Sequence, residues 1–250
     1  MAKKFKDYYD LDCAELIADK ILRVDGTFNK RGFTKYLKKE LPDKEFTARQ
    51  DAFADAFEKY LPDDYSKNIS LFEKILGEEL QTTEGMFIYG WWLWPVGRYV
   101  QRNGLNDYDA SINFIYELTK RFTGEFAIRT LLEAHPKKTM RTMIKWSKDK
   151  NVHVRRLASE GVRIKLPWAK KLTVALDEFE SFKKILTNLK NDKEKFVLKS
   201  VGNNLNDLMK EAPQLANQII DEWKNDNPSK ETLWIIKHGE RSLRKKGKSK

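Results

Sequence analysis

A pattern of paired amphipathic helices repeats through the second half of this 250-residue chain. Three segments each end an apolar helix with a polar turn that closes on an aspartate, at Asp149, Asp192 and Asp226. The spacings between these aspartates, 43 and 34 residues, are close to the period of HEAT-like helical pairs. Such repeats stack into a curved, superhelical solenoid whose second helices line a concave face. The sequence therefore predicts an all-α fold of antiparallel helical pairs with a concave basic groove.

After each aspartate, a second helix is expected with a small residue near its middle: Ala158, Gly202 and Gly239. The polar side chains of these second helices are expected to gather in the groove. They are Arg155, Arg156, Glu160, Asn203, Asn204, Asp207, Lys237, His238 and Arg241. A solenoid with such a face is usually a protein-binding scaffold, so the fold alone does not decide the function.

Turn signals divide the first half of the chain into further helices. They are expected near 11–23, 30–41, 45–60 and 66–76, followed by a tryptophan-rich helix over roughly 84–102. Packing between neighbouring helices best explains Trp91, Trp92 and Trp94, although three aromatic residues in four positions cannot all face one side.

One domain is expected over residues 1–246, made of an N-terminal helical part (about 1–104) and a basic repeat half (about 105–246). Residues 247–250 are expected to form a basic tail.

The positive charge of the chain is concentrated at its C-terminal end. Residues 1–140 hold 22 Lys and Arg against 23 Asp and Glu, whereas residues 141–250 hold 26 against 14. Such one-sided charge favours binding to nucleic acid, because neutralising phosphates releases counterions. A merely solvated basic face, or an acidic protein partner, remains the alternative.

One acid stands alone in the most basic stretch, residues 151–171, which carries six cationic side chains and the single carboxylate of Glu160. Helical spacing places Arg156, Glu160 and Arg163 on one face, and Leu166-Pro167 is expected to end the helix just before Trp168. The plain alternative is an ordinary helix ion pair worth roughly 0.3–0.5 kcal/mol. A carboxylate among cations nevertheless stays ionised, and an ionised carboxylate can stabilise a developing positive charge.

Other classes of site find no support in the sequence. His135, His153 and His238 lack ligand-like spacing, so no metal or cofactor is expected. The single Cys13 excludes an internal disulfide framework, and the longest apolar run is too short and interrupted to span a membrane. We expect a monomeric, cytoplasmic protein with no membrane or obligate protein partner.

Four motifs resemble those of the AlkC branch of the AlkC/AlkD-type DNA glycosylases. They are HVRRLASEG-x-R-x-x-LPWA (153–169), RFTGEFAIR (121–129), the TEG…WP-x-x-R-Y-V block (83–100) and the S-V-x-NNLND run that ends at Asp207. The resemblance implies a HEAT-like solenoid that removes cationic N-alkylated bases, chiefly 3-methyladenine, from double-stranded DNA without flipping the lesion into a deep pocket. Relatives commonly have Pro and Arg where this chain has Ile164 and Lys165. Some append a C-terminal β-sandwich, which this chain is expected to lack.

The resemblance also implies roles for individual residues. Glu125 and Glu160 match the active-site carboxylates, Asp207 matches a third acid, and Trp168 matches the aromatic residue beside the lesion. Arg156 matches an arginine near the DNA backbone. The basic side chains of the C-terminal half complete the expected DNA-binding set, which is Arg155, Arg156, Arg163, Lys165, Lys171, Lys237 and Arg241.

Two other functions remain open from the sequence. The chain could be a non-catalytic DNA-binding HEAT protein, such as a lesion sensor. It could also be a protein-interaction scaffold whose basic half binds acidic partners.

Overall fold

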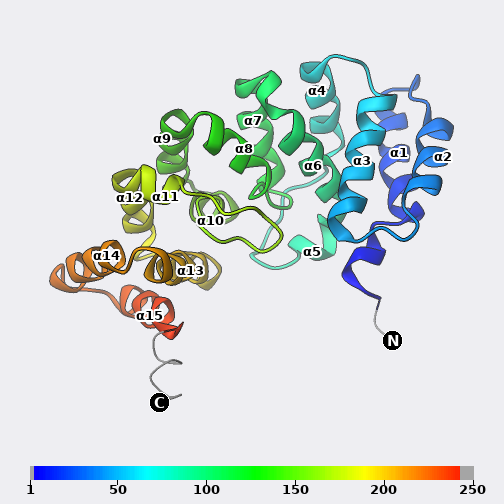
Figure 1. Cartoon of the computed structure of the whole chain (residues 1–250). Coiled ribbons are helices and arrows are strands. Elements are labelled where there is room, and N and C mark those ends of the chain that lie inside the picture. Colours follow the sequence, from blue (N-terminus) through cyan, green and yellow to red (C-terminus); the bar gives the residue numbers. More distant parts are fainter. Residues whose placement is uncertain (1–2, 243–250) are drawn as a thin grey trace. The chain divides into compact units, whose positions relative to one another are not determined.

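The structure is a computed structural model that describes residues 3–242, all of which lie in helices, short 3-10 segments, turns or loops (Figure 1). The chain divides into two compact units, residues 1–130 and 131–250. The prediction of an all-α fold is confirmed over the described residues. The basic tail expected at 247–250 lies outside them.

The first unit begins with a short 3-10 segment and continues through antiparallel helices. Its elements are η1 (Phe5–Tyr8), α1 (Leu11–Val24), α2 (Lys30–Glu40), α3 (Phe46–Tyr60), α4 (Tyr65–Ile75), α5 (Met86–Tyr89), η2 (Trp91–Leu93), α6 (Trp94–Asn103), η3 (Gly104–Asn106) and α7 (Tyr108–Thr119). Helix α1 packs on α2 and α4, and α3 packs on α2 and α6. The four helices expected before residue 77 are confirmed to within one residue at each end.

The tryptophan-rich segment is not the single helix that its sequence predicted. Gly85 adopts a positive φ of 93°, a conformation that favours glycine, and α5 ends after one turn at Tyr89. A 3-10 turn follows, and α6 then starts with Pro95 in its first turn. Trp92 and Trp94 are buried, which agrees with their expected role in helix packing.

The second unit contains the expected helical pairs. Helix α8 (Ala127–Ala134) contains the boundary between the units, and α11 (Val174–Asp177) is a short helix before the second pair. The three pairs are α9 (Pro136–Trp146) with α10 (Val152–Glu160), α12 (Phe179–Leu189) with α13 (Lys195–Glu211), and α14 (Pro213–Asn225) with α15 (Lys230–Gly239).

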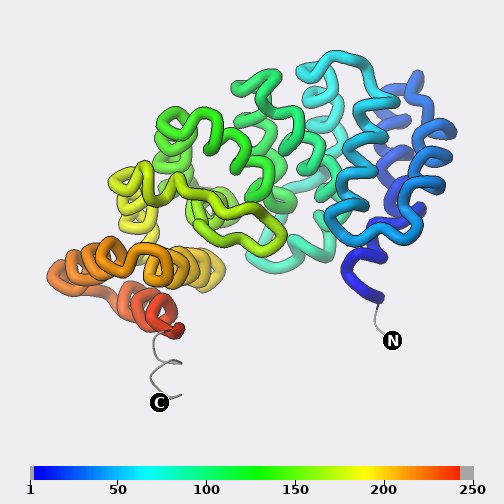
Figure 2. The backbone as a smooth tube through the Cα atoms, in the orientation of Figure 1, coloured from blue at the N-terminus to red at the C-terminus, as the bar shows by residue number. Residues whose placement is uncertain are grey.

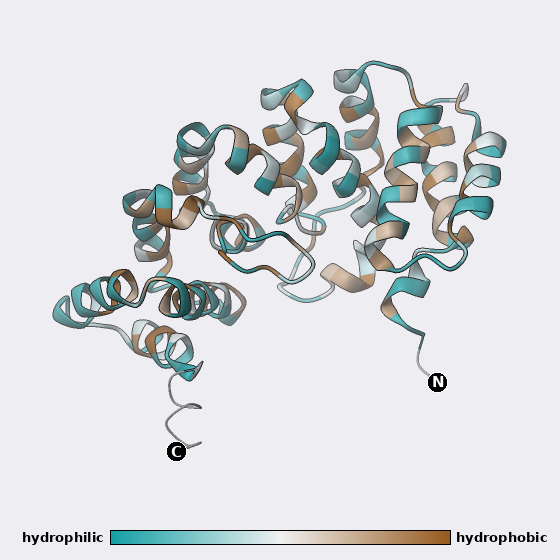
Figure 3. Cartoon of the chain, in the orientation of Figure 1, coloured by the Kyte–Doolittle hydropathy of each residue, from teal (hydrophilic) through white to brown (hydrophobic). Residues whose placement is uncertain are grey.

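The second helices of these pairs pack side by side, α10 on α13 and α13 on α15 (Figures 1 and 2). Apolar and polar residues alternate along the helices, as Figure 3 shows, and the apolar residues form the buried core. The expected layer of second helices is therefore present within this unit.

Two glycines allow α13 and α15 to approach closely. A Cβ atom on Gly202 would lie 2.7 Å from His238 Cδ2, and one on Gly239 would lie 2.7 Å from Leu205 Cβ. The repeat pattern predicted that Gly239 would lie near the middle of its helix. It is instead the last residue of α15. The glycine is placed where the two helices touch, so contact with the neighbouring helix explains it better than its position within its own helix.

Replacing Gly239 with alanine is expected to lower the free energy of unfolding by about 1–3 kcal/mol, because Leu205 Cβ is close to the backbone and cannot swing away. Chemical denaturation measures this change. Gly26→Ala is the matched control, because an added Cβ there meets nothing within 4 Å. Equal stabilities of the two variants would contradict the close-packing explanation.

Candidate active site

Helix α10 places the first candidate carboxylate at its C-terminal end. The side chain of Asn151 caps the helix by accepting hydrogen bonds from the backbone N–H groups of His153 (2.9 Å) and Val154 (3.3 Å). Val154, Leu157 and Ala158 are fully buried. Their burial fixes the rotation of the helix, so that Arg156 and Glu160 emerge together on the side that faces α13.

The helix ends at Glu160, earlier than the Leu166-Pro167 break that the sequence predicted. The backbone N–H of Arg163 donates to the carbonyl of Glu160 (3.3 Å), and the chain then leaves the helix so that Val162 and Ile164 become completely buried. This turn brings the Arg163 side chain back onto Glu160. Burial of two apolar residues after the helix therefore outweighs their capacity to continue it.

Glu160 is buried but surrounded by groups that stabilise its charge. Its Oε1 lies 2.8 Å from Arg163 Nη1 and 3.5 Å from Arg156 Nη2, and its Oε2 accepts a 2.6 Å hydrogen bond from Ser200 Oγ. Burial alone would raise the pKa of Glu160, but Arg156, Arg163 and the Ser200 hydroxyl together lower it below its ordinary value. The carboxylate is therefore ionised at neutral pH.

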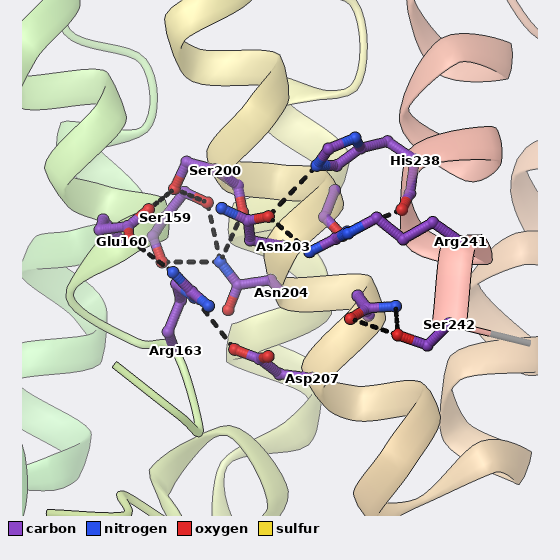
Figure 4. Close-up of polar contacts among 12 residues, drawn as sticks. Ser159, Glu160, Arg163, Ser200, Asn203, Asn204, Asp207, His238, Arg241 and Ser242 are labelled. Carbon is purple, nitrogen blue, oxygen red and sulfur yellow. Dashed lines mark hydrogen bonds and ion pairs between the residues drawn. The ribbon is translucent and has the colours of Figure 1, made fainter. Parts of the chain in front are cut away.

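Arg163 joins Glu160 to a second buried acid. Its Nε lies 3.0 Å from Oδ2 of Asp207, which comes from α13 (Figure 4). Burial would lower the pKa of Arg163, but the two carboxylates outweigh it and raise that pKa. The structure thus brings four of the sequence-predicted site residues, Arg156, Glu160, Arg163 and Asp207, into one ion-paired cluster.

A polar stripe on α13 holds this cluster in place. Ser200, Asn204 and Asp207 follow the i, i+4, i+7 spacing of one helix face. Ser200 Oγ lies 2.9 Å from Ser159 Oγ, and Asn204 Nδ2 donates to the Ser159 carbonyl at 2.8 Å. Ser159 and Ser200 were not among the predicted site residues, although Ser200 opens the motif that ends at Asp207. Its helical spacing from Asp207 was the signal that could have found it.

The stripe continues onto α15 through Asn203. Its Oδ1 accepts a hydrogen bond from Nη2 of Arg241 (2.9 Å) and lies 3.2 Å from Nε2 of His238, as Figure 4 shows. The His238 ring stacks on Trp234 with 5.0 Å between centroids. Burial, with further contributions from Arg241 and Lys199, lowers the pKa of His238. Arg241 thus contacts Asn203, another of the polar residues that were expected to gather together.

Trp168 lies in the loop that follows α10 and is 62% exposed. The backbone N–H of Ala169 donates to the carbonyl of Leu166 (3.2 Å), which closes a four-residue turn around Pro167 and Trp168. Trp168 has a φ of 60°, in the left-handed region where turns of this kind prefer glycine or asparagine. A bulky residue is rare in this conformation, so the turn carries backbone strain.

The remaining predicted DNA-binding residues have different surroundings. Arg155 braces the turns between helices: its Nε lies 2.7 Å from Asp192 Oδ2, and its Nη1 donates to the carbonyls of Asp149 and Lys150. Lys165 and Lys171 are about half exposed and pair with Glu211, whereas Lys237 is exposed on α15. Glu211 was not among the predicted site residues.

Glu125 belongs to the first unit and lies in the turn before α8. Its Oε2 accepts a 3.1 Å hydrogen bond from Thr123 Oγ1, and its own backbone N–H donates to that hydroxyl (3.3 Å). The residue is buried, in a turn whose Phe126 ring lies 5.0 Å from that of Trp94. Glu125 is thus held by its own turn.

Within residues 3–242, no group of three or more histidine, cysteine or acidic side chains is arranged to hold a metal ion. No helix in the same range has the length and apolar character to cross a membrane.

The strained turn at Trp168 leads to a prediction about stability. Trp168→Asn replaces the indole with a residue that tolerates a positive φ, so the free energy of unfolding should stay within about 1 kcal/mol of the original value or rise. Thermal and urea unfolding measure this. A loss of several kcal/mol would show that the exposed indole is a structural support.

Comparison with known proteins places the chain in a family. The family model described as "DNA alkylation repair enzyme" matches residues 123–239, which include every candidate carboxylate. An uncharacterized protein of Bacillus subtilis, YhaZ, is 42% identical over 149 residues, which cover 60% of this chain and 41% of the relative. The chain thus spans about two-fifths of the length of that curated relative.

A solved structure extends the similarity to almost the whole chain. The alkylpurine DNA glycosylase AlkC of Pseudomonas fluorescens, bound to DNA containing an abasic site analog, has a TM-score of 0.86 and 32% sequence identity over 99% of this chain and 66% of its own. The family model and the solved structure agree with the family resemblance of the sequence. The chain belongs to the DNA alkylation repair enzyme family of the AlkC/AlkD type.

Proposed function

We propose that this protein is a monofunctional DNA glycosylase that excises cationic N-alkylated bases, chiefly 3-methyladenine, from double-stranded DNA. The observation that carries this proposal is the cluster in which Arg163 contacts both Glu160 and Asp207. The similarity to an alkylpurine DNA glycosylase supports the same reaction class.

The ionised state of Glu160 suits this chemistry. An N3-alkylated adenine already carries a positive charge, so the base can leave without being protonated by an acid. The transition state for cleavage of the glycosidic bond resembles an oxocarbenium ion at the sugar. A fixed, ionised carboxylate stabilises that charge, and the lowered pKa keeps Glu160 ionised across the physiological range.

The carboxylates can also orient the water that attacks the sugar. In this proposal Glu160 and Asp207 stabilise the positive charge that develops on the sugar and orient the attacking water. Glu125 is a further carboxylate assigned by its motif. Hydrolysis leaves an abasic site, and no lysine nucleophile or strand cleavage is required. Asp207 is fixed by Arg163 from one side, which limits the movement of its carboxylate.

The exposed indole of Trp168 is proposed to contact the lesion nucleotide. A cation over an indole face gains about 0.5–2 kcal/mol, so a positively charged base would bind more tightly than its neutral counterpart. The base would be read in place without flipping. The surplus of Lys and Arg in residues 141–250 is proposed to bind the phosphates on either side.

A purely structural role for the cluster is the competing explanation. The same ion pairs join α10 to α13, and such contacts would also occur in a DNA-binding protein without catalytic activity. The two explanations differ in what happens when only the charge of Glu160 is removed.

Replacing Glu160 with glutamine should lower the single-turnover rate of 3-methyladenine release by about 100-fold or more, because the charge that stabilises the transition state is lost.

Glu125→Gln should also lose activity. Trp168→Asn should excise the base more slowly without losing stability. Base release from an oligonucleotide with a defined lesion measures the rates, and fluorescence anisotropy measures DNA affinity, which should change little.

Glu222→Gln is the matched control, because Glu222 is an ion-paired glutamate of the same unit that lies outside the cluster. Its rate should equal that of the unsubstituted protein. Unchanged excision by both Glu160→Gln and Glu125→Gln would sink the catalytic assignment. If the unsubstituted protein released no base but bound DNA, it would be a non-catalytic binding protein.

A further inference from the structure

The loop that presents Trp168 has a fixed base and an exposed tip. The backbone N–H of Leu172 donates to the carbonyl of Ile164 (3.1 Å), which closes the loop between these two residues. Ile164, Leu166 and Leu172 are buried and anchor it to the unit, whereas Trp168 at the tip is exposed. Apolar burial therefore fixes where the loop begins and ends.

Two lysines flank the tip and meet on one carboxylate. Lys165 Nζ lies 2.7 Å from Oε1 of Glu211, and Lys171 Nζ lies 2.5 Å from Oε2. Glu211 is the last residue of α13. Hydrogen bonds from Lys165 and then Lys171 lower the pKa of Glu211 to about 2, so its charge persists at any pH at which the protein would act. Each oxygen of the carboxylate thus holds one side of the loop.

The contact of Glu211 with its two lysines differs from an ordinary surface ion pair. The side chain of Glu211 is 17% exposed, whereas those of Lys165 and Lys171 are 55% and 49% exposed. Single exposed pairs stabilise little and are screened by salt. A carboxylate that bridges two residues six positions apart restricts the segment between them, and Trp168 lies in that segment.

The bridge also removes positive charge from a basic surface. Lys165 and Lys171 would otherwise be free to pair with phosphates of any DNA, damaged or not. While both lysines contact Glu211, their net attraction for phosphate is reduced. The contact therefore acts on the orientation of Trp168 and on sequence-independent affinity at once.

We propose that Glu211 is a positioning and specificity-determining residue. It ties Lys165 to Lys171, holds the Trp168 tip ready for the lesion nucleotide, and limits binding to undamaged DNA. This inference rests on the proposed glycosylase function for its effect on excision. Its effects on the loop and on undamaged DNA do not depend on that function.

The first measurement reads the loop without requiring any activity. The protein is labelled with 5-fluorotryptophan, and the ¹⁹F resonance of Trp168 is assigned by its disappearance in Trp168→Phe. Glu211→Gln should shift or broaden this resonance, and Glu222→Gln, which removes a carboxylate paired with Lys183, should not. An unchanged Trp168 resonance in Glu211→Gln would overturn the positioning role.

The second measurement reads affinity for undamaged duplex as a function of salt. Glu211→Gln should bind about 3- to 10-fold more tightly, and its slope of log affinity against log salt should steepen by up to about two, because two lysines become available to phosphates. The double variant Lys165→Met/Lys171→Met should perturb the Trp168 resonance in the same way. It should bind undamaged duplex more weakly than the unsubstituted protein does. Glu222→Gln makes the same change in net charge as Glu211→Gln, so the affinity of Glu211→Gln for undamaged duplex should exceed that of Glu222→Gln. Equal affinities of these two variants would overturn the effect on specificity.

The third measurement is single-turnover excision of 3-methyladenine by the same variants. Glu211→Gln should be about 5- to 10-fold slower at saturating protein despite its tighter binding, Glu211→Asp should recover part of the rate, and Glu222→Gln should match the unsubstituted protein. A full rate in Glu211→Gln would overturn the role in catalysis. If even the unsubstituted protein released no base while the resonance and affinity changed as expected, the proposed function would fail and the positioning of the loop would stand.

Discussion

The shared contact of Arg163 with Glu160 and Asp207 is the interaction on which the candidate site depends. Without a cation between them, two buried carboxylates on different helices would repel each other. Arg163 reaches both because α10 ends at Glu160 and the chain turns back at once. The lowered pKa of Glu160 and the start of the Trp168 loop both follow from that turn.

Helical periodicity was sufficient to predict much of this arrangement. The turns at Asp149, Asp192 and Asp226 separate the helices of each pair, and the spacing of Arg156 and Glu160 predicted their contact. Residues between helices were harder to predict. Arg163 was expected within a helix, but its backbone is free to turn because Val162 and Ile164 gain burial outside it. That gain depends on neighbouring helices, which local sequence does not reveal.

The residues that contact the predicted site residues were also not predicted from the sequence. Ser200 and Glu211 lie on the same face of α13 as Asp207, so their spacing was visible. Their contacts with Glu160, Lys165 and Lys171, however, join α13 to α10 and to the loop after it, which belong to a different helical pair. The left-handed turn at Trp168 was equally hidden, because the sequence Leu-Pro-Trp-Ala does not contain the glycine that usually marks it. Residues that break a local preference are therefore informative once the structure is known.

The most direct test of the account is the pH dependence of 3-methyladenine excision with and without Arg163. The unsubstituted protein should show a rate constant, corrected for spontaneous base loss, that is flat between about pH 5.5 and 8, because Glu160 stays ionised. Arg163→Met should raise the pKa of Glu160, so its rate should be lower and should fall further as the pH is reduced, whereas Arg163→Lys should retain more of the flat profile. A flat, full-rate profile for Arg163→Met would contradict the account.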